Sequence, residues 1–153
     1  MSRRLVEWST RLNPLVSAIL RSRVHWLLSP GLMLITVTGR KSGRRYTIPV
    51  GYLQTADAII ILISEAPSKM WWRNYRDEGP IEVLLRGRRR GGRALLVQPT
   101  SPEFRARADA GFRRSRFIAR IFGIDFDPRG GLSNAQVEQL ARRAAIVRVT
   151  LDP

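Results

Sequence analysis

A basic turn bracketed by glycines, set between two strand-like apolar runs, is the feature that most constrains the fold of this chain. Residues 39–43 read Gly-Arg-Lys-Ser-Gly, and residues 32–37 and 46–53 on either side show the clustered or alternating apolar pattern of β-strands. The glycines permit positive φ and close approach of a ligand to the backbone. We therefore expect the turn to bind an oxyanion such as phosphate, although it could also be a solvated hairpin tip.

The sequence around this turn separates it from the common nucleotide-binding loop. No glycine directly precedes Lys41, and no helical pattern follows Ser42, so the turn is not a Walker A motif. Pro49 removes a backbone donor from the second strand, which predicts an edge strand or a bulge at that position. The unpaired backbone groups of such a strand would be available to a ligand ring.

Composition narrows the classes of function. The chain has 153 residues and no cysteine, which fits one domain and excludes disulfides, thiolate metal sites and a cysteine nucleophile. His25 is the only histidine, so a histidine-based metal centre or triad is not expected, and we place His25 at a surface or helix end. The net charge of +15 favours anionic partners: nucleic acid, anionic lipid or a polyanionic cofactor.

No apolar run is long enough to cross a bilayer. The expected location is cytoplasmic, and contact with a membrane surface is left open.

Periodicity predicts the other elements. Residues 1–30 are expected to be helical in two pieces, with Asn13 as a cap and Pro14 in the first turn. This segment either packs on a sheet or, through its arginines, Trp8 and Trp26, rests on an anionic membrane. Residues 58–63 are continuously apolar, which predicts a strand buried on both faces. Ser68 is expected to cap a short helix whose tryptophans lie in the core or wall a planar ligand.

The second half predicts a hairpin followed by helices and a last strand. Residues 81–85 and 93–97 flank an Arg- and Gly-rich segment, 86–92, expected to be a solvated loop or, alternatively, a nucleic-acid-binding one. A Thr100/Glu103 capping box is expected to open a helix that runs to Phe122, with Phe117 among its apolar positions. A second capping box opens residues 133–143, and residues 146–151 form a strand. The Asp125 and Asp127 pair offers too few ligands to predict a metal site. The fold class expected is α+β, mainly β: a barrel of about six mostly antiparallel strands with flanking helices.

Four segments taken in order resemble the deazaflavin-dependent nitroreductase family. They are Thr38-Gly39-Arg40-Lys41-Ser42-Gly43, then Thr47-Ile48-Pro49-Val50, then a strand, then Trp71-Trp72-Arg73-Asn74-Tyr75, and a short strand follows them after Gly79-Pro80. The resemblance covers roughly residues 32–98. It implies a split β-barrel that binds coenzyme F420, as a monomer or a homodimer. Together with the predicted elements, this gives a single domain, 1–153. It consists of an N-terminal helical extension (1–30), a cofactor-binding barrel core (32–98), a helical segment (100–143) and a last strand (144–151).

The resemblance also implies site residues and an activity. Arg40, Lys41 and Ser42, framed by Thr38, Gly39 and Gly43, would hold the cofactor phosphate, and Ile48, Pro49 and Val50 would lie against the deazaflavin ring. Met70 and Trp71 would border the ring, with Lys69 replacing a cation that relatives place after the central strand. The implied enzyme is an F420H2-dependent reductase that transfers a hydride to a quinone, nitroaromatic or unsaturated acceptor. Ser64, Tyr75 or water would donate the proton.

Two other readings of the residues remain open. A split barrel could instead hold FMN, whose phosphate the same turn would take, or haem. A non-catalytic protein could bind nucleic acid or anionic membrane through the arginines of residues 86–93 and the N-terminal helix.

Overall fold

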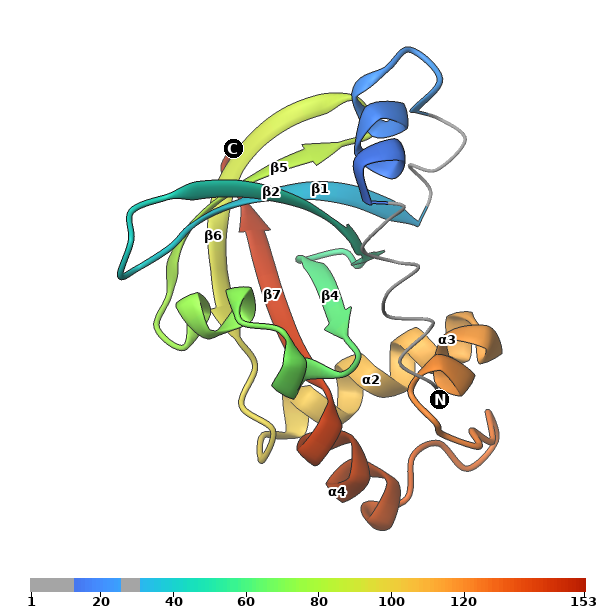
Figure 1. Cartoon of the computed structure of the whole chain (residues 1–153). Helices are drawn as coiled ribbons and strands as arrows, with labels where there is room; N and C mark the ends of the chain where they lie inside the picture. Colours follow the sequence, from blue (N-terminus) through green and yellow to red (C-terminus); the bar gives the residue numbers. More distant parts are fainter. Residues whose placement is uncertain (1–12, 26–30) are drawn as a thin grey trace.

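The protein forms one curled antiparallel sheet with helices packed mainly at one end (Figure 1). The structure is a computed structural model that describes residues 13–25 and 31–153. Within these residues, seven strands pair in the order β2-β1-β5-β6-β7-β4-β3. Their bounds are β1 Leu32–Thr38, β2 Arg45–Gly51, β3 Leu53–Gln54, β4 Ile59–Ile63, β5 Gly79–Leu85, β6 Arg88–Leu96 and β7 Ala145–Leu151.

The order of the strands explains why the sheet curls. β2 and β3 are the two outermost strands, yet only Tyr52 separates them in the chain. The two edges of the sheet therefore meet at one residue, which bends the sheet into a half-open barrel. The Tyr52 backbone N–H donates to the Gly31 carbonyl at 3.2 Å and holds this junction against the start of β1.

Alternation along the strands produces two apolar cores, one on each face of the sheet. Inside the curl, Ile35, Val37, Ile61, Val83 and Val147 are almost completely buried with their neighbours. On the other face of the sheet, side chains of β3, β4 and β7 pack with those of the helices and of the segment between residues 121 and 134. They form the second core, which includes Ile60, Phe104, Phe112, Leu132 and Ile146. β4 is buried on both faces, as its continuous apolar sequence predicts.

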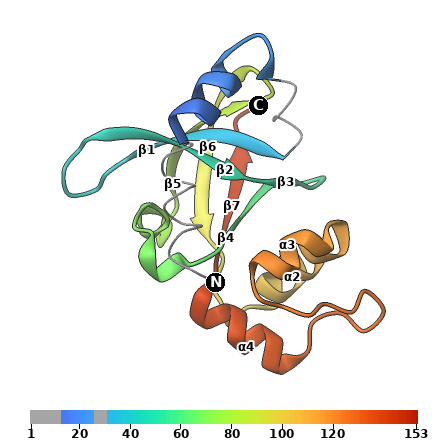
Figure 2. The ribbon, with the colours of Figure 1, turned by 45° about the vertical axis from the view of Figure 1, so that its right-hand side comes forward.

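The helices that cover the second core are α2 Pro102–Arg114, α3 Arg116–Ile121 and α4 Asn134–Arg143. In Figure 2 all three lie at the lower end of the barrel, far from the N-terminal helix at the top. The predicted capping box of α4 is confirmed: Ser133 Oγ accepts from the Gln136 N–H, and the Gln136 side chain accepts from the Ser133 N–H.

The prediction of a loop at residues 86–92 is wrong. Leu85 pairs with Arg88, so the turn contains only Arg86 and Gly87, whose φ angles are 48° and 76°. Positive φ at both positions is the conformation of a tight two-residue hairpin turn. The remaining arginines and glycines of the segment belong to β6. Gly92 fits there because a Cβ would lie 2.5 Å from the Thr150 carbonyl oxygen of β7, a contact that the sequence alone does not reveal.

Three predicted helix signals are also corrected. The segment after β4 forms two short 3-10 helices, η2 Ala66–Ser68 and η3 Trp71–Tyr75, so Ser68 ends the first instead of capping a helix. Ser101, rather than Thr100, caps α2, because its Oγ accepts from the Phe104 N–H. The helix does not run unbroken to Phe122: Ser115 ends α2 in an extended conformation and caps α3.

In the described part of the N-terminal segment, residues 13–21 are α-helical. Asn13 lies within this helix, so the prediction that it caps the helix ahead of Pro14 is wrong. Leu20 is buried and Leu15 is exposed, so one face packs on the barrel. Trp8 and Trp26, expected to contribute to a membrane-facing surface, lie outside the described residues. Among the helices of the described residues, none combines the length and apolarity that spanning a bilayer requires.

Candidate active site

The turn between β1 and β2 has the compact, hydrogen-bonded form of an anion-binding loop. The Gly39 N–H donates to the Arg44 carbonyl and the Gly43 N–H to the Gly39 carbonyl, each at 2.9 Å. Gly43 has a φ of 64°, the left-handed conformation that favours glycine. The Ser42 hydroxyl oxygen accepts from the Arg44 N–H at 3.3 Å and lies 2.8 Å from where a Cβ on Gly39 would be. The two glycines therefore let the turn close over its own backbone.

Closing the turn leaves several donors for a ligand. Among the described residues, the N–H groups of Lys41 and Ser42 have no hydrogen-bond acceptor, and no carboxylate pairs with Lys41 or Arg44. Both side chains are exposed. Backbone and cationic donors that converge on one small turn are the usual means of holding a phosphate. The residues present thus fit the phosphate of a nucleotide-like cofactor.

The helix η3 supports the turn from across the barrel opening. The Asn74 side-chain oxygen accepts from the Arg40 N–H at 3.4 Å, and the Arg40 guanidinium contacts the Asp77 carboxylate at 3.4 Å. Burial raises the pKa of the Tyr46 hydroxyl, on the second residue of β2, and the nearby Asn74 side chain lowers it to a smaller extent. Sequence reasoning missed Tyr46, Asn74 and Asp77 as site residues. The sequence Trp-Trp-Arg-Asn-Tyr could have indicated Asn74, because it places a side-chain amide two residues after the tryptophans that were expected to border the ligand.

The strand expected to carry a ligand ring is the edge strand β2. Val37 pairs with Tyr46 and Ile35 with Ile48, so Tyr46, Ile48 and Val50 share the inner face of the curl. Ile48 and Val50 are half-buried there, and Pro49 faces the opposite side of the sheet. The prediction that Pro49 marks an edge strand is confirmed, because β2 pairs with one strand only, β1, within residues 13–25 and 31–153. No strand of the described residues pairs with the other backbone edge of β2.

The three residues after β4 that were expected to contact the cofactor differ in how accessible they are to a ligand. Trp71 is 6% exposed and packs edge-on against Tyr75 in the inner core, with ring centroids 6.3 Å apart. Met70 is 66% exposed and is available to a ligand. The Lys69 ammonium donates to the Ser64 carbonyl at 2.7 Å, and burial lowers the pKa of Lys69. The Lys69 ammonium is thus hydrogen-bonded to the backbone directly after β4.

The two candidate proton donors lie in different surroundings. Tyr75 is 2% exposed, its hydroxyl donates to the Pro80 carbonyl at 3.3 Å, and burial raises the pKa of Tyr75 to about 12. Ser64 is half-buried and lines a hollow of about 270 Å³ together with Glu65, Phe122 and Arg143. Ser64 is therefore the more accessible of the two.

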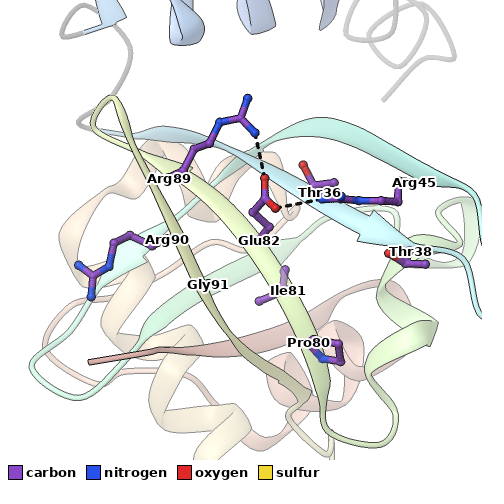
Figure 3. A pocket seen from close by; sticks show the side chains of 9 residues that line it. All are labelled: Thr36, Thr38, Arg45, Pro80, Ile81, Glu82, Arg89, Arg90 and Gly91. Carbon is purple, nitrogen blue, oxygen red and sulfur yellow. Dashed lines mark hydrogen bonds and ion pairs between the residues drawn. The ribbon is translucent and has the colours of Figure 1, made fainter.

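A second hollow, of about 420 Å³, lies on the outer face of the sheet beside the turn (Figure 3). Thr38 is the one predicted site residue that lines it. Figure 3 shows the Glu82 carboxylate between two guanidinium groups, those of Arg45 at 2.9 Å and Arg89 at 3.2 Å. The Glu82 carboxylate neutralises part of the positive charge of this hollow, whereas no carboxylate of the described residues pairs with Lys41 or Arg44. Among the described residues, no group of acidic or histidine side chains could hold a metal ion.

Comparison with known structures supports the fold. HutZ, a heme storage protein from Vibrio cholerae, superposes with a TM-score of 0.51 at 15% identity, over 93% of this chain and 91% of that one. A structure described as a domain-swapped dimer gives the same TM-score at 13% identity, over 86% of this chain and 98% of the other. These likenesses and the curled antiparallel sheet confirm the predicted split β-barrel, with seven strands instead of about six.

Comparison of sequences identifies the family. No curated protein matches the chain. Residues 20–114 match the family model of the F420H(2)-dependent quinone reductases, and this stretch includes the turn, β2, η3 and the strands that frame them. Because the match extends over more than half of its 153 residues, the chain belongs to the F420H(2)-dependent quinone reductase family.

Proposed function

We propose that this protein binds F420 between the β1–β2 turn and the inner face of β2 and reduces electron-poor acceptors such as quinones. The observation that carries the proposal is the turn itself. It presents two N–H groups and the cations of Lys41 and Arg44 without an acceptor among the described residues, next to the half-buried apolar face of an edge strand. Family membership supports this cofactor and an oxidoreductase activity.

In this proposal the turn holds the phosphate of the cofactor. Lys41 and Ser42 contribute N–H groups, the Lys41 ammonium adds a charge, and the Ser42 hydroxyl can turn toward an oxyanion. The Arg40 guanidinium is paired with Asp77, and the Arg40 N–H donates to Asn74. We therefore assign Arg40 mainly to fixing the position of the turn. Thr38, Gly39 and Gly43 shape the turn. The positive field of the chain also suits an acidic cofactor tail.

The apolar part of the site would hold the ring system. Ile48 and Val50 offer aliphatic side chains on the inner face, Pro49 keeps part of the β2 edge free of a donor, and Met70 provides an exposed, adaptable border. Trp71 supports this wall from the core. When bound, reduced F420 supplies the hydride, and the protein contributes orientation and exclusion of water.

We assign the proton to Ser64 or to water at its hydroxyl, in preference to Tyr75. The Tyr75 hydroxyl is buried and already donates to Pro80, and a pKa of about 12 disfavours its release of a proton near neutral pH. Its proposed role is to position: it packs against Trp71 and fixes the start of β5. A Tyr75→Phe variant is therefore expected to retain most activity.

FMN is the second candidate cofactor, because the same turn would accept its phosphate. Haem has less support: HutZ is a heme storage protein, but its likeness at 15% identity concerns the fold. The single histidine, His25, lies against the β5–β6 turn, where its Nε2 is 2.6 Å from the Cβ position of Gly87. That turn and the β1–β2 turn stand at different ends of the sheet in Figure 1.

The nucleic-acid reading is weakened by the structure of β6. Arg89 pairs with Glu82 and Arg93 with Glu78, while Arg90 donates to the Asp152 carbonyl. These arginines are partly engaged within a strand that is paired on both sides, instead of extending from a free loop.

The activity is tested by anaerobic oxidation of F420H2 with a quinone, a nitroaromatic compound and an unsaturated ketone offered separately. We expect turnover that depends on both protein and acceptor, fastest with the quinone. Lys41→Ala should raise the KM for F420H2, and Arg88→Ala, which removes an exposed arginine away from the site, serves as the matched control. Acceptor reduction by none of the three compounds, in a protein that binds F420, would contradict the proposed activity.

A further inference from the structure

The interruption of the helix after α2 creates an exposed apolar surface that the proposed active site does not use. Ser115 ends α2 and starts α3 in a new direction. As a result Phe117, which a continuous helix would be expected to bury, is 70% exposed, and Ile121 is 37% exposed. These two residues are four apart on α3 and therefore lie on the same face of the helix.

The surroundings of these two side chains are strongly basic. Residues 110–124 contain Arg113, Arg114, Arg116 and Arg120 and no acidic residue. All four arginines are exposed. Asp109 engages Arg113, whereas no carboxylate of the described residues pairs with Arg114, Arg116 or Arg120. An apolar pair is thus framed by cations that have no partner within the described part of the protein.

We propose that α3 docks on an anionic lipid bilayer, with Phe117 and Ile121 entering the interface and Arg114, Arg116 and Arg120 contacting the headgroups. Aromatic and aliphatic side chains beside arginines on a short amphipathic helix are the composition of interfacial membrane anchors. Arginine side chains can extend along an apolar surface while their guanidinium groups reach the headgroups. In Figures 1 and 2, α3 lies at the helical end of the molecule, beside α2 and away from the N-terminal helix.

Charge argues against a second copy of the chain as the occupant. In a two-fold contact through α3, the unpaired arginines of one copy would face those of the other. The same charges attract anionic lipid, whose surface potential favours each arginine near the bilayer. A bilayer also needs no shape-complementary groove, and the exposed part of α3 is a projecting helix of six residues.

The proposal is independent of the cofactor and of the reductase activity. The docking face is, however, continuous with the hollow beside Ser64, because Ile121 lines that hollow as well. Docking through α3 would therefore bring this hollow close to the lipid surface, where apolar acceptors concentrate.

The test is flotation of the full-length protein with vesicles of phosphatidylcholine alone or mixed with phosphatidylglycerol. We expect binding to the anionic vesicles only, and weaker binding as salt is raised. Arg116→Gln/Arg120→Gln should lower the partition coefficient roughly 25-fold, that is, fivefold for each charge. The control Arg23→Gln/Arg88→Gln removes two exposed arginines at the other end of the molecule and should have a markedly smaller effect.

A single fluorescent label then locates the contact. Because the chain has no cysteine, Phe117→Cys and Leu15→Cys each provide one site for an environment-sensitive dye. The dye at Phe117 should shift to the blue on anionic vesicles and the dye at Leu15, on the N-terminal helix, should not. The proposal is overturned if wild-type protein does not float with anionic vesicles, if both arginine pairs weaken binding equally, or if only the Leu15 label shifts.

Discussion

The side-chain oxygen of Asn74 lies 3.4 Å from the backbone nitrogen of Arg40, so η3 directly contacts the turn that follows β1. Residues far apart in the chain thus cooperate to fix the conformation of a small basic loop. The distance is at the long end of hydrogen-bond geometry, so the contact is a weak one.

Asn74→Ala should weaken F420 binding without unfolding the protein. Loss of one such hydrogen bond costs about 1 kcal/mol, which corresponds to roughly a fivefold rise in the dissociation constant. The measurement is a fluorescence titration, with Gln54→Ala on the exposed side of β3 as the control. An unchanged dissociation constant would show that η3 does not support the turn.

Two adjacent glycines of β6 should differ in their tolerance of a methyl group. A Cβ on Gly92 would lie 2.5 Å from the Thr150 backbone oxygen, whereas on Gly91 the nearest atom, at 2.7 Å, belongs to the movable side chain of Asp152. Gly92→Ala should destabilise the fold by about 1–3 kcal/mol, the usual cost of overpacking. Gly91→Ala should cost less. Urea denaturation of both variants measures the difference, and equal midpoints would argue against the β6–β7 pairing.

Alkaline pH should destabilise the protein through Tyr75. Its pKa is about 12 in the folded protein because of burial, against 10.0 for the unfolded chain. Above pH 10 the unfolded chain loses the phenolic proton first, so stability falls as the pH rises and levels off above pH 12. Two pKa units correspond to at most about 2.7 kcal/mol.

The matched variant for this pH effect is Tyr75→Phe, which keeps the ring against Trp71 and removes the ionisable group. Denaturation midpoints measured from pH 8 to pH 12 should fall more steeply for the wild type than for the variant. Parallel curves would mean that other groups cause the alkaline destabilisation.

Much of the barrel could be predicted because its signals are local. The apolar run of β4, the proline of β2 and the Ser133 capping box each determine structure within a few residues, and all three predictions are confirmed. The glycines of β6 misled the prediction, since Gly92 is required by the close approach of β7, some 58 residues further along the chain. A contact between strands that are distant in the chain cannot be predicted from the sequence around either strand.

The candidate site was predictable in part for the same reason. The donors of the turn are consecutive in sequence, so Lys41 and Ser42 could be identified as a unit. Asn74 and Asp77 come from another element, and their contacts with Arg40 depend on the curl of the sheet. Similarly, the exposure of Phe117 depends on the break at Ser115, where the serine competes for backbone hydrogen bonds that the helix would otherwise make.

The most direct test of the central claim is an equilibrium titration of the purified protein with F420, and with FMN in parallel, for the wild type, Lys41→Ala and the control Arg88→Ala. The account predicts saturable binding of F420 that is tighter than binding of FMN. Loss of a charge-assisted contact to phosphate costs about 1.5–3 kcal/mol, so Lys41→Ala should bind F420 roughly 10- to 100-fold more weakly while Arg88→Ala binds normally. Equal affinity of the wild type and Lys41→Ala for F420, or no binding of F420 at all, would contradict the assignment of this turn as the cofactor site.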